Sequence, residues 1–140
     1  MKLAGFRYCM IIGALALIGL ALYYFSRYFV LAIALNNNDL QPDLEDSIRA
    51  LWLAFACQAL LIGLLYALVA WKPHSVSREV IVIFGLLQLV EATLQFSFSG
   101  SGVAAGLLIA AALFVLLGSV LWPKRLPLVP ATPGSPGIVR

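Results

Sequence analysis

The chain has 140 residues, of which 63% are hydrophobic and 11% are charged, and its formal net charge is +3. Soluble domains contain about 45 to 50% apolar and about 25% charged residues, so this composition excludes an ordinary soluble domain and predicts an integral membrane protein. The basic residues stand at the ends of apolar segments and form no basic run, so we expect no nucleic-acid partner. Four spans of about 20 residues leave no room for a soluble catalytic domain.

The first apolar stretch covers residues 8–35 and follows Lys2 and Arg7. A charged start and an apolar middle also occur in secretory signals, but this stretch is longer than the roughly 7 to 15 apolar residues of a signal and contains bulky aromatic residues. We therefore expect a retained first span. A helix over this stretch is about 42 Å long, so it must tilt in, or protrude from, a hydrocarbon layer of about 30 Å.

A polar turn follows, because residues 36–39 read Asn-Asn-Asn-Asp. Gln41-Pro42-Asp43 predicts the start of a new helix, since proline suits the first turn and acidic residues complement the positive end of the helix dipole. The carboxylates of this region lack the spacing and the glycine of a calcium loop, so we expect capping and not a metal site. They are Asp39, Asp43, Glu45 and Asp46.

The second span covers residues 51–71 and is closed by Lys72 and Pro73. Small residues recur in it every three or four positions, which allows another helix to approach closely and predicts a packing face that includes Gly63. Gln58 lies beside this face.

The third span, residues 79–98, carries Glu91 well inside an otherwise aliphatic helix. Gln88, Glu91 and Gln95 follow one another at spacings of three and four, so the three polar side chains share one stripe. A carboxylate in hydrocarbon costs about 2.5 to 3.5 kcal/mol or more. This stripe therefore predicts polar partners on another helix.

The fourth span covers residues 103–122, and a stripe of small residues runs along its first half: Gly102, Gly106 and Ala110. We interpret this stripe as a packing contact inside the bundle, with a dimer face as the alternative. Residues 123–140 are rich in proline and glycine and predict a disordered tail, because such a segment cannot bury enough apolar surface to fold.

The charges at the ends of the spans predict the threading. One face would hold seven basic residues, which are Lys2, Arg7, Lys72, Arg78, Lys124, Arg125 and Arg140, against Glu79 alone. The other face would hold the four carboxylates of residues 39–46 against Arg49. By the positive-inside rule, we expect an all-α, four-transmembrane-helix antiparallel bundle over residues 1–122, with both termini and the 123–140 tail cytoplasmic.

The threading also predicts a buried polar cluster of Glu91, Gln58, Gln95, Gln88 and Arg27. Counting about 1.5 Å per residue, Gln58 and Glu91 lie at similar depths, about 13 and 12 Å from the outer boundary. Gln95 lies nearer to the surface and Gln88 deeper. Arg27 has two interpretations, either an ion pair with Glu91 or an arginine that snorkels to the outer interface among tyrosines.

The spans carry few of the residues from which a function can be inferred. The spans contain no histidine, nucleophile triad, metal-ligand cluster or phosphate loop, so we expect no catalytic residues, no cofactor and no enzyme.

The leading hypothesis is a multi-pass protein of the cell membrane, the inner membrane in a bacterium. It would act as an accessory or scaffold for a membrane-protein partner or a second copy, or would hold a hydrophobic ligand. One alternative is a proton-coupled small transporter that works as an oligomer through Glu91. Another is a membrane enzyme that uses Glu91 with Tyr23 and Tyr24 on a lipid-like substrate.

The threading can be tested with a reporter enzyme that is active only outside the cytoplasm. Fused after Arg140, the reporter should be inactive, whereas the same reporter inserted between Asn37 and Asn38 should be active. Activity of the fusion after Arg140 would overturn the predicted threading.

Overall fold

The computed structural model describes residues 2–38, 41–73, 75–99 and 102–122, which form four α-helices and no strand. The helices are α1 (Lys2–Asn36), α2 (Pro42–Trp71), α3 (Arg78–Ser99) and α4 (Val103–Val120). Each is long and apolar enough to cross a membrane, so the predicted all-α fold with four helices of membrane-spanning length is confirmed. The predicted tail, residues 123–140, lies outside the described residues.

The second helix begins where the sequence predicts it. Pro42 occupies its first turn together with Asp43 and Glu45, and Gln41 has an extended backbone. At the other end, the backbone N–H of Lys72 donates to the carbonyl oxygen of Leu68 at 2.7 Å. The helices otherwise differ from the predicted spans at their ends: α1 also includes the residues before Tyr8, and α4 ends at Val120.

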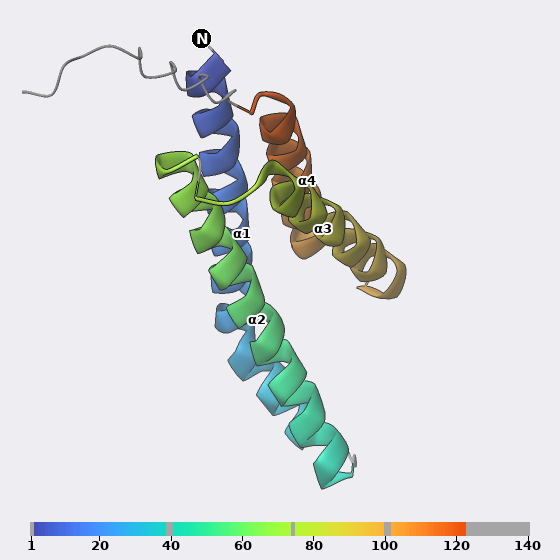
Figure 1. Cartoon of the computed structure of the whole chain (residues 1–140). Coiled ribbons are helices and arrows are strands. Elements are labelled where there is room, and N and C mark those ends of the chain that lie inside the picture. The colour runs from blue at the N-terminus through green and yellow to red at the C-terminus, as the bar shows by residue number, and fades with distance from the viewer. Residues whose placement is uncertain (1, 39–40, 74, 100–101, 123–140) are drawn as a thin grey trace, which may run out of the picture.

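The two helix pairs differ in length. At about 1.5 Å per residue, α1 and α2 are about 52 and 45 Å long, whereas α3 and α4 are about 33 and 27 Å long. Figure 1 shows α1 and α2 side by side and continuing past the ends of α3 and α4. The start of α1, the segment between α2 and α3, and the end of α4 lie at the same end of the molecule (Figure 1). The rings of Phe6 and Trp122 meet there, 5.2 Å apart.

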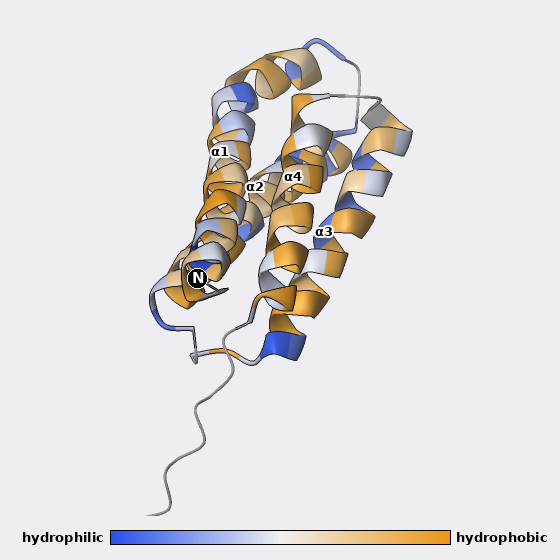
Figure 2. Ribbon diagram, turned by 90° about the horizontal axis from the view of Figure 1, so that it is seen from above, coloured by the Kyte–Doolittle hydropathy of each residue, from blue (hydrophilic) through white to orange (hydrophobic). Residues whose placement is uncertain are grey.

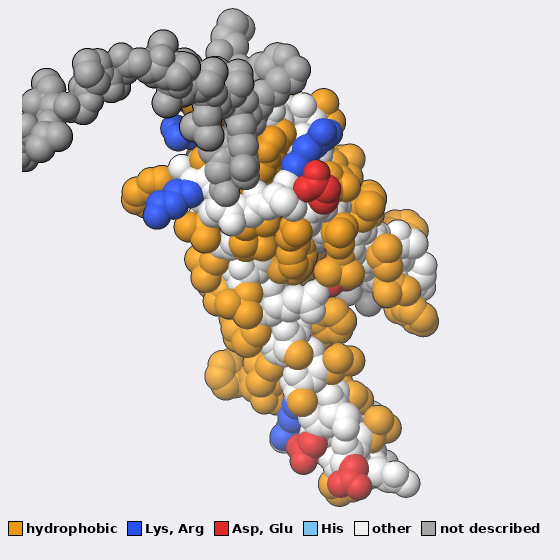
Figure 3. All heavy atoms as spheres, in the orientation of Figure 1, with side chains coloured by type: hydrophobic (Ala, Val, Ile, Leu, Met, Phe, Trp, Pro, Cys, Tyr) orange, Lys and Arg blue, Asp and Glu red, His pale blue; other side chains and the backbone are white. Residues whose placement is uncertain are grey.

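Helix α1 is the centre of the packing. It contacts α2 and α4 closely, and α3 packs against α4. Phe6, Met10 and Leu17 of α1 are buried together with Tyr66 of α2 and Val115 of α4. Large apolar side chains are exposed on all four helices, most of whose ribbon is hydrophobic in Figure 2, and Figure 3 shows charged side chains near the two ends of the molecule. This distribution suits a protein surrounded by lipid.

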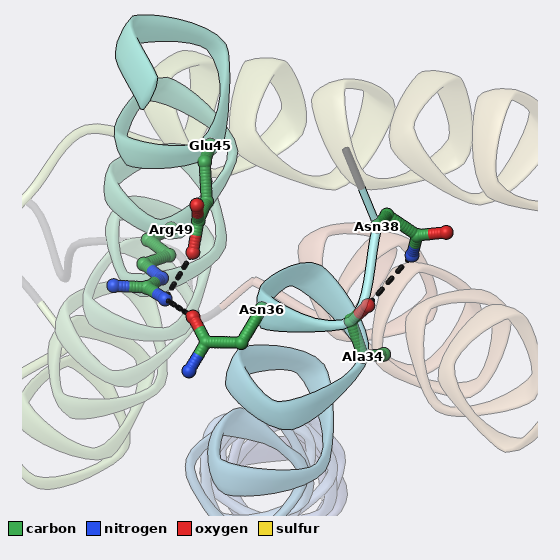
Figure 4. Close-up of polar contacts among 5 residues, drawn as sticks. All are labelled: Ala34, Asn36, Asn38, Glu45 and Arg49. Atoms are coloured by element: carbon green, nitrogen blue, oxygen red, sulfur yellow. Dashed lines mark hydrogen bonds and ion pairs between the residues drawn. The ribbon is translucent and has the colours of Figure 1, made fainter. Parts of the chain in front are cut away.

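The far end of the α1 and α2 pair is held by polar contacts of its own. The Nη2 atom of Arg49 donates to Asn36 Oδ1 and forms an ion pair with Glu45 (Figure 4). Asn38 Nδ2 donates to the carbonyl oxygen of Ala34 at 2.6 Å, which closes the last turn of α1 (Figure 4). The bond from Arg49 to Asn36 joins the two helices where α3 and α4 do not reach.

Small residues make close contacts in the bundle, but not all of those that the sequence indicates. A Cβ at Gly63 would lie 3.2 Å from the carbonyl oxygen of Ala14, so Gly63 allows α2 to approach α1. A Cβ at Gly102 or Gly106 would meet nothing within 4 Å. The interpretation of these two glycines as a contact inside the bundle is therefore corrected, because they point away from the neighbouring helices. Ala110 is half-buried.

Gly13 makes the closest of these approaches. A Cβ there would lie 2.6 Å from Cγ2 of Val115, on α4. Because a β-branched valine in a helix cannot easily rotate away, any side chain at residue 13 would push α1 and α4 apart.

We expect Gly13→Ala to destabilise the folded protein by about 1 to 3 kcal/mol through overpacking. Gly106→Ala is the matched control and should be neutral or stabilising by up to about 1 kcal/mol, because alanine is the better helix former. Thermal unfolding in mild detergent, followed by circular dichroism, measures both. Equal midpoints for the two variants would contradict the close packing of α1 on α4.

Candidate functional site

Three polar side chains of α3 reach the α1 and α2 pair. They are Gln88, Glu91 and Gln95, the stripe that the sequence indicates, and each is hydrogen-bonded to a different residue. None of these bonds lies between helices with close backbone contact, because α3 packs closely only against α4. The polar side chains therefore bridge the space between α3 and the α1 and α2 pair.

The central bridge joins Glu91 and Gln58. Gln58 Nε2 donates to Glu91 Oε1 at 2.5 Å, and both side chains are half-buried. Their similar predicted depths are thus matched by a direct contact. One amide hydrogen bond satisfies part of the carboxyl group, which has two oxygens and about four acceptor positions.

A deeper bridge joins Gln88 and Tyr66. Both side chains are fully buried, and Gln88 Nε2 donates to the hydroxyl oxygen of Tyr66 at 2.9 Å. Gln88 Oε1 is buried and has no hydrogen-bond partner among the described residues. A buried acceptor without a partner is costly, by about 1 to 3 kcal/mol, so this oxygen is a point where a ligand can add a bond.

A third bridge lies toward the far end of α3. The hydroxyl of Tyr24 donates to Gln95 Oε1 at 3.2 Å. Trp52 holds Tyr24 in place, because its Nε1 donates to the carbonyl oxygen of Tyr24 at 2.9 Å and the two rings meet edge to face, 5.0 Å apart. This bridge thus includes residues from α1, α2 and α3.

Arg27 does not belong to this cluster. Its side chain is exposed, and its guanidinium carbon lies 5.9 Å from the centre of the Tyr23 ring. Among the described residues, the one ion pair joins Arg49 and Glu45. Of the two interpretations of Arg27, the structure agrees with the arginine that lies outside the bundle beside tyrosine.

The three bridges surround a cavity of about 380 Å³. Its walls are apolar apart from the three polar side chains of α3, Gln58 and Tyr24. Apolar residues from all four helices complete the lining: Leu17, Leu20, Leu51, Phe55, Ala59, Ile62, Leu94, Phe98 and Leu108. A mostly apolar pocket with a few converging polar groups is the usual form of a small-molecule site.

The mouth of the cavity lies between α2 and α3. Leu51 and Phe55 of α2 and Leu94 and Phe98 of α3 line the cavity and are also exposed, Phe98 by as much as 86%. In a membrane these apolar side chains face the lipid. The cavity therefore opens toward hydrocarbon, while its polar groups lie further inside.

No protein-family model matches the chain, and no curated protein or solved structure matches it. Its function must therefore be argued from the cavity itself.

Tyr66 belongs to the site, as does the link from Tyr24 and Trp52 to Gln95, although the polar stripe of α3 does not indicate either. Tyr66 lies eight residues after Gln58 on α2, so the two side chains share one face of the helix, two turns apart. A tyrosine hydroxyl deep inside an apolar span needs a partner, and this was the signal available in the sequence.

Glu91→Ala should destabilise the folded protein by about 1 to 3 kcal/mol, because it leaves the Gln58 amide without its acceptor. Glu91→Gln should cost much less, since its carbonyl oxygen still accepts that bond. The unfolding midpoints of both variants in mild detergent test this difference. Equal losses would show that the bridge to Gln58 contributes nothing to stability.

Proposed function

We propose that this protein is a multi-pass membrane protein that binds a hydrophobic, amphipathic ligand in the cavity between α3 and the α1 and α2 pair. The observation that carries the proposal is the cavity itself, which has apolar walls, a mouth lined by exposed apolar residues and a polar interior around Glu91. A volume of about 380 Å³ falls within the range of about 300 to 1,000 Å³ that is usual for ligand pockets.

The ligand would enter from the bilayer and not from water. The residues at the mouth are apolar and would lie among lipid tails, so an apolar molecule already dissolved in the membrane reaches the cavity without crossing a polar barrier. Its polar end would then meet Gln58, Glu91 and Gln95, and its apolar body would lie against Leu51, Phe55 and Leu94.

The role we propose is binding without turnover. The titratable groups that line the cavity are the carboxyl of Glu91 and the phenol of Tyr24. Both are already engaged in hydrogen bonds, to Gln58 and Gln95. Within the described residues, no three side chains of His, Cys, Asp or Glu lie close enough together to hold a metal ion. A binding protein requires only the contacts that are present.

We further propose an antiparallel arrangement in the cell membrane with both termini cytoplasmic. The excess of basic residues around Arg7, Lys72 and Arg78, against the acidic residues near Asp43 and Glu45, supports this orientation. Gly106 is exposed and a Cβ there would meet nothing within 4 Å, so a membrane-protein partner or a second copy can approach α4 at this residue. We propose that this protein binds its ligand on behalf of such a partner.

Filling the cavity tests the proposed function. Ala59 lines the cavity and is 7% exposed, so Ala59→Phe should occupy the ligand's space. We expect the wild-type protein, purified in mild detergent, to retain an apolar small molecule that mass spectrometry detects, and we expect Ala59→Phe to lose it.

The matched control is Ala54→Phe, the same substitution on the same helix at an exposed residue outside the cavity. It should retain the molecule at the wild-type level. Ala59→Leu adds less bulk and guards against misfolding of the larger variant, and it should lower the amount retained. The same amount in all four proteins would contradict binding in the cavity.

A further inference from the structure

The charge inside the cavity is unbalanced. Glu91 is the one acidic residue among the fourteen residues of the lining, and none of the fourteen is a lysine, arginine or histidine. Gln58 gives Glu91 a neutral hydrogen bond, which leaves a negative charge uncompensated when the carboxyl is ionised. A buried charge in apolar surroundings is stable only when it is paired.

The described cations of the chain do not supply the missing charge. Arg27 lies against the Tyr23 ring outside the cavity, and Arg49 is paired with Glu45 at the far end of the α1 and α2 pair. The opposite charge has to come with a ligand or as a proton.

A second, independent observation also points to the ligand. Gln88 is fully buried, lines the same cavity one helical turn from Glu91, and its Oε1 has no partner among the described residues. Its amide nitrogen is directed to Tyr66, which leaves the oxygen as an acceptor. The Glu91 carboxylate and the Gln88 oxygen are thus two acceptors that line the cavity with free acceptor positions, and an N–H group that carries a positive charge would satisfy both.

We infer that the ligand is a protonated amine on an apolar body, with its ammonium group between Glu91 and Gln88. This inference rests on the proposed function and specifies its ligand. A molecule whose polar end carries a phosphate or a carboxylate would place a second negative charge beside Glu91 with no cation to balance it, so the cavity selects against such lipids.

Binding of matched amphiphiles tests the inference. The wild-type protein in phosphatidylcholine nanodiscs is titrated with decylamine and, separately, with decan-1-ol, and dissociation constants are measured by calorimetry against empty nanodiscs. We expect decylamine to bind at least tenfold more tightly than decan-1-ol. Glu91→Gln should abolish this preference, whereas Glu91→Asp, which keeps the charge, should retain it.

Glu79→Gln is the matched control, because Glu79 is an exposed acid in the first turn of the same helix. It should bind decylamine as the wild type does. Equal loss of preference in the Glu79 and Glu91 variants would show a surface effect and would overturn the inference. Equal affinity of the wild type for the amine and the alcohol would also overturn the inference, because it would show that Glu91 does not require a cationic ligand.

The failure of the inference differs from the failure of the proposed function. If both amphiphiles bind equally and Ala59→Phe weakens both, the cavity still binds ligands and only the charge preference is wrong. If neither amphiphile binds the wild type more tightly than Ala59→Phe, the proposed binding function fails, and the inference fails with it.

The role of Gln88 is tested with decyltrimethylammonium, which has the charge but no N–H group. We expect Gln88→Leu to weaken the binding of decylamine severalfold and to leave that of decyltrimethylammonium unchanged. Equal weakening of both would show that the Gln88 oxygen accepts no bond from the ligand, which would overturn its assignment.

Discussion

The structure depends on the rule that polar side chains within a membrane must find partners in the protein, because lipid tails offer none. Helix α3 carries three such side chains on one stripe, and each is bonded to the α1 and α2 pair. These bonds determine how α3 faces the rest of the chain, although its close packing is against α4 alone. The long bridging side chains span the space between α3 and the α1 and α2 pair, and the cavity lies in that space.

Much of the architecture follows from the sequence. Apolar length predicts the four helices, and Pro42 with the acidic residues after it predicts the start of α2. The depths of Gln58 and Glu91, counted along two separate spans, bring them to the same level. These features depend only on helical rise and on the chemistry of helix ends, which are local properties.

Other features depend on how the helices are rotated about their axes, which a single sequence leaves open. Gly106 and Gly63 look alike in sequence, yet only Gly63 faces a neighbouring helix. Gly13 lies against Val115, whereas a Cβ at Gly19 on the same helix would meet nothing within 4 Å. The partners of Gln88 and Gln95 were also missed, because tyrosines near the middle and the end of a span are equally compatible with packing and with hydrogen bonding.

The unequal lengths of the helix pairs have a consequence for the surrounding lipid. Helices α3 and α4 match a hydrocarbon layer of about 30 Å, whereas α1 and α2 continue past them with exposed apolar residues such as Phe29 and Ile33. In a bilayer the longer pair has to tilt, protrude or thicken the layer around it, and each ångström of mismatch costs a fraction of a kcal/mol. Helix α3 ends at Ser99, one residue after Phe98 at the mouth, so the difference in length falls on the side where the cavity opens.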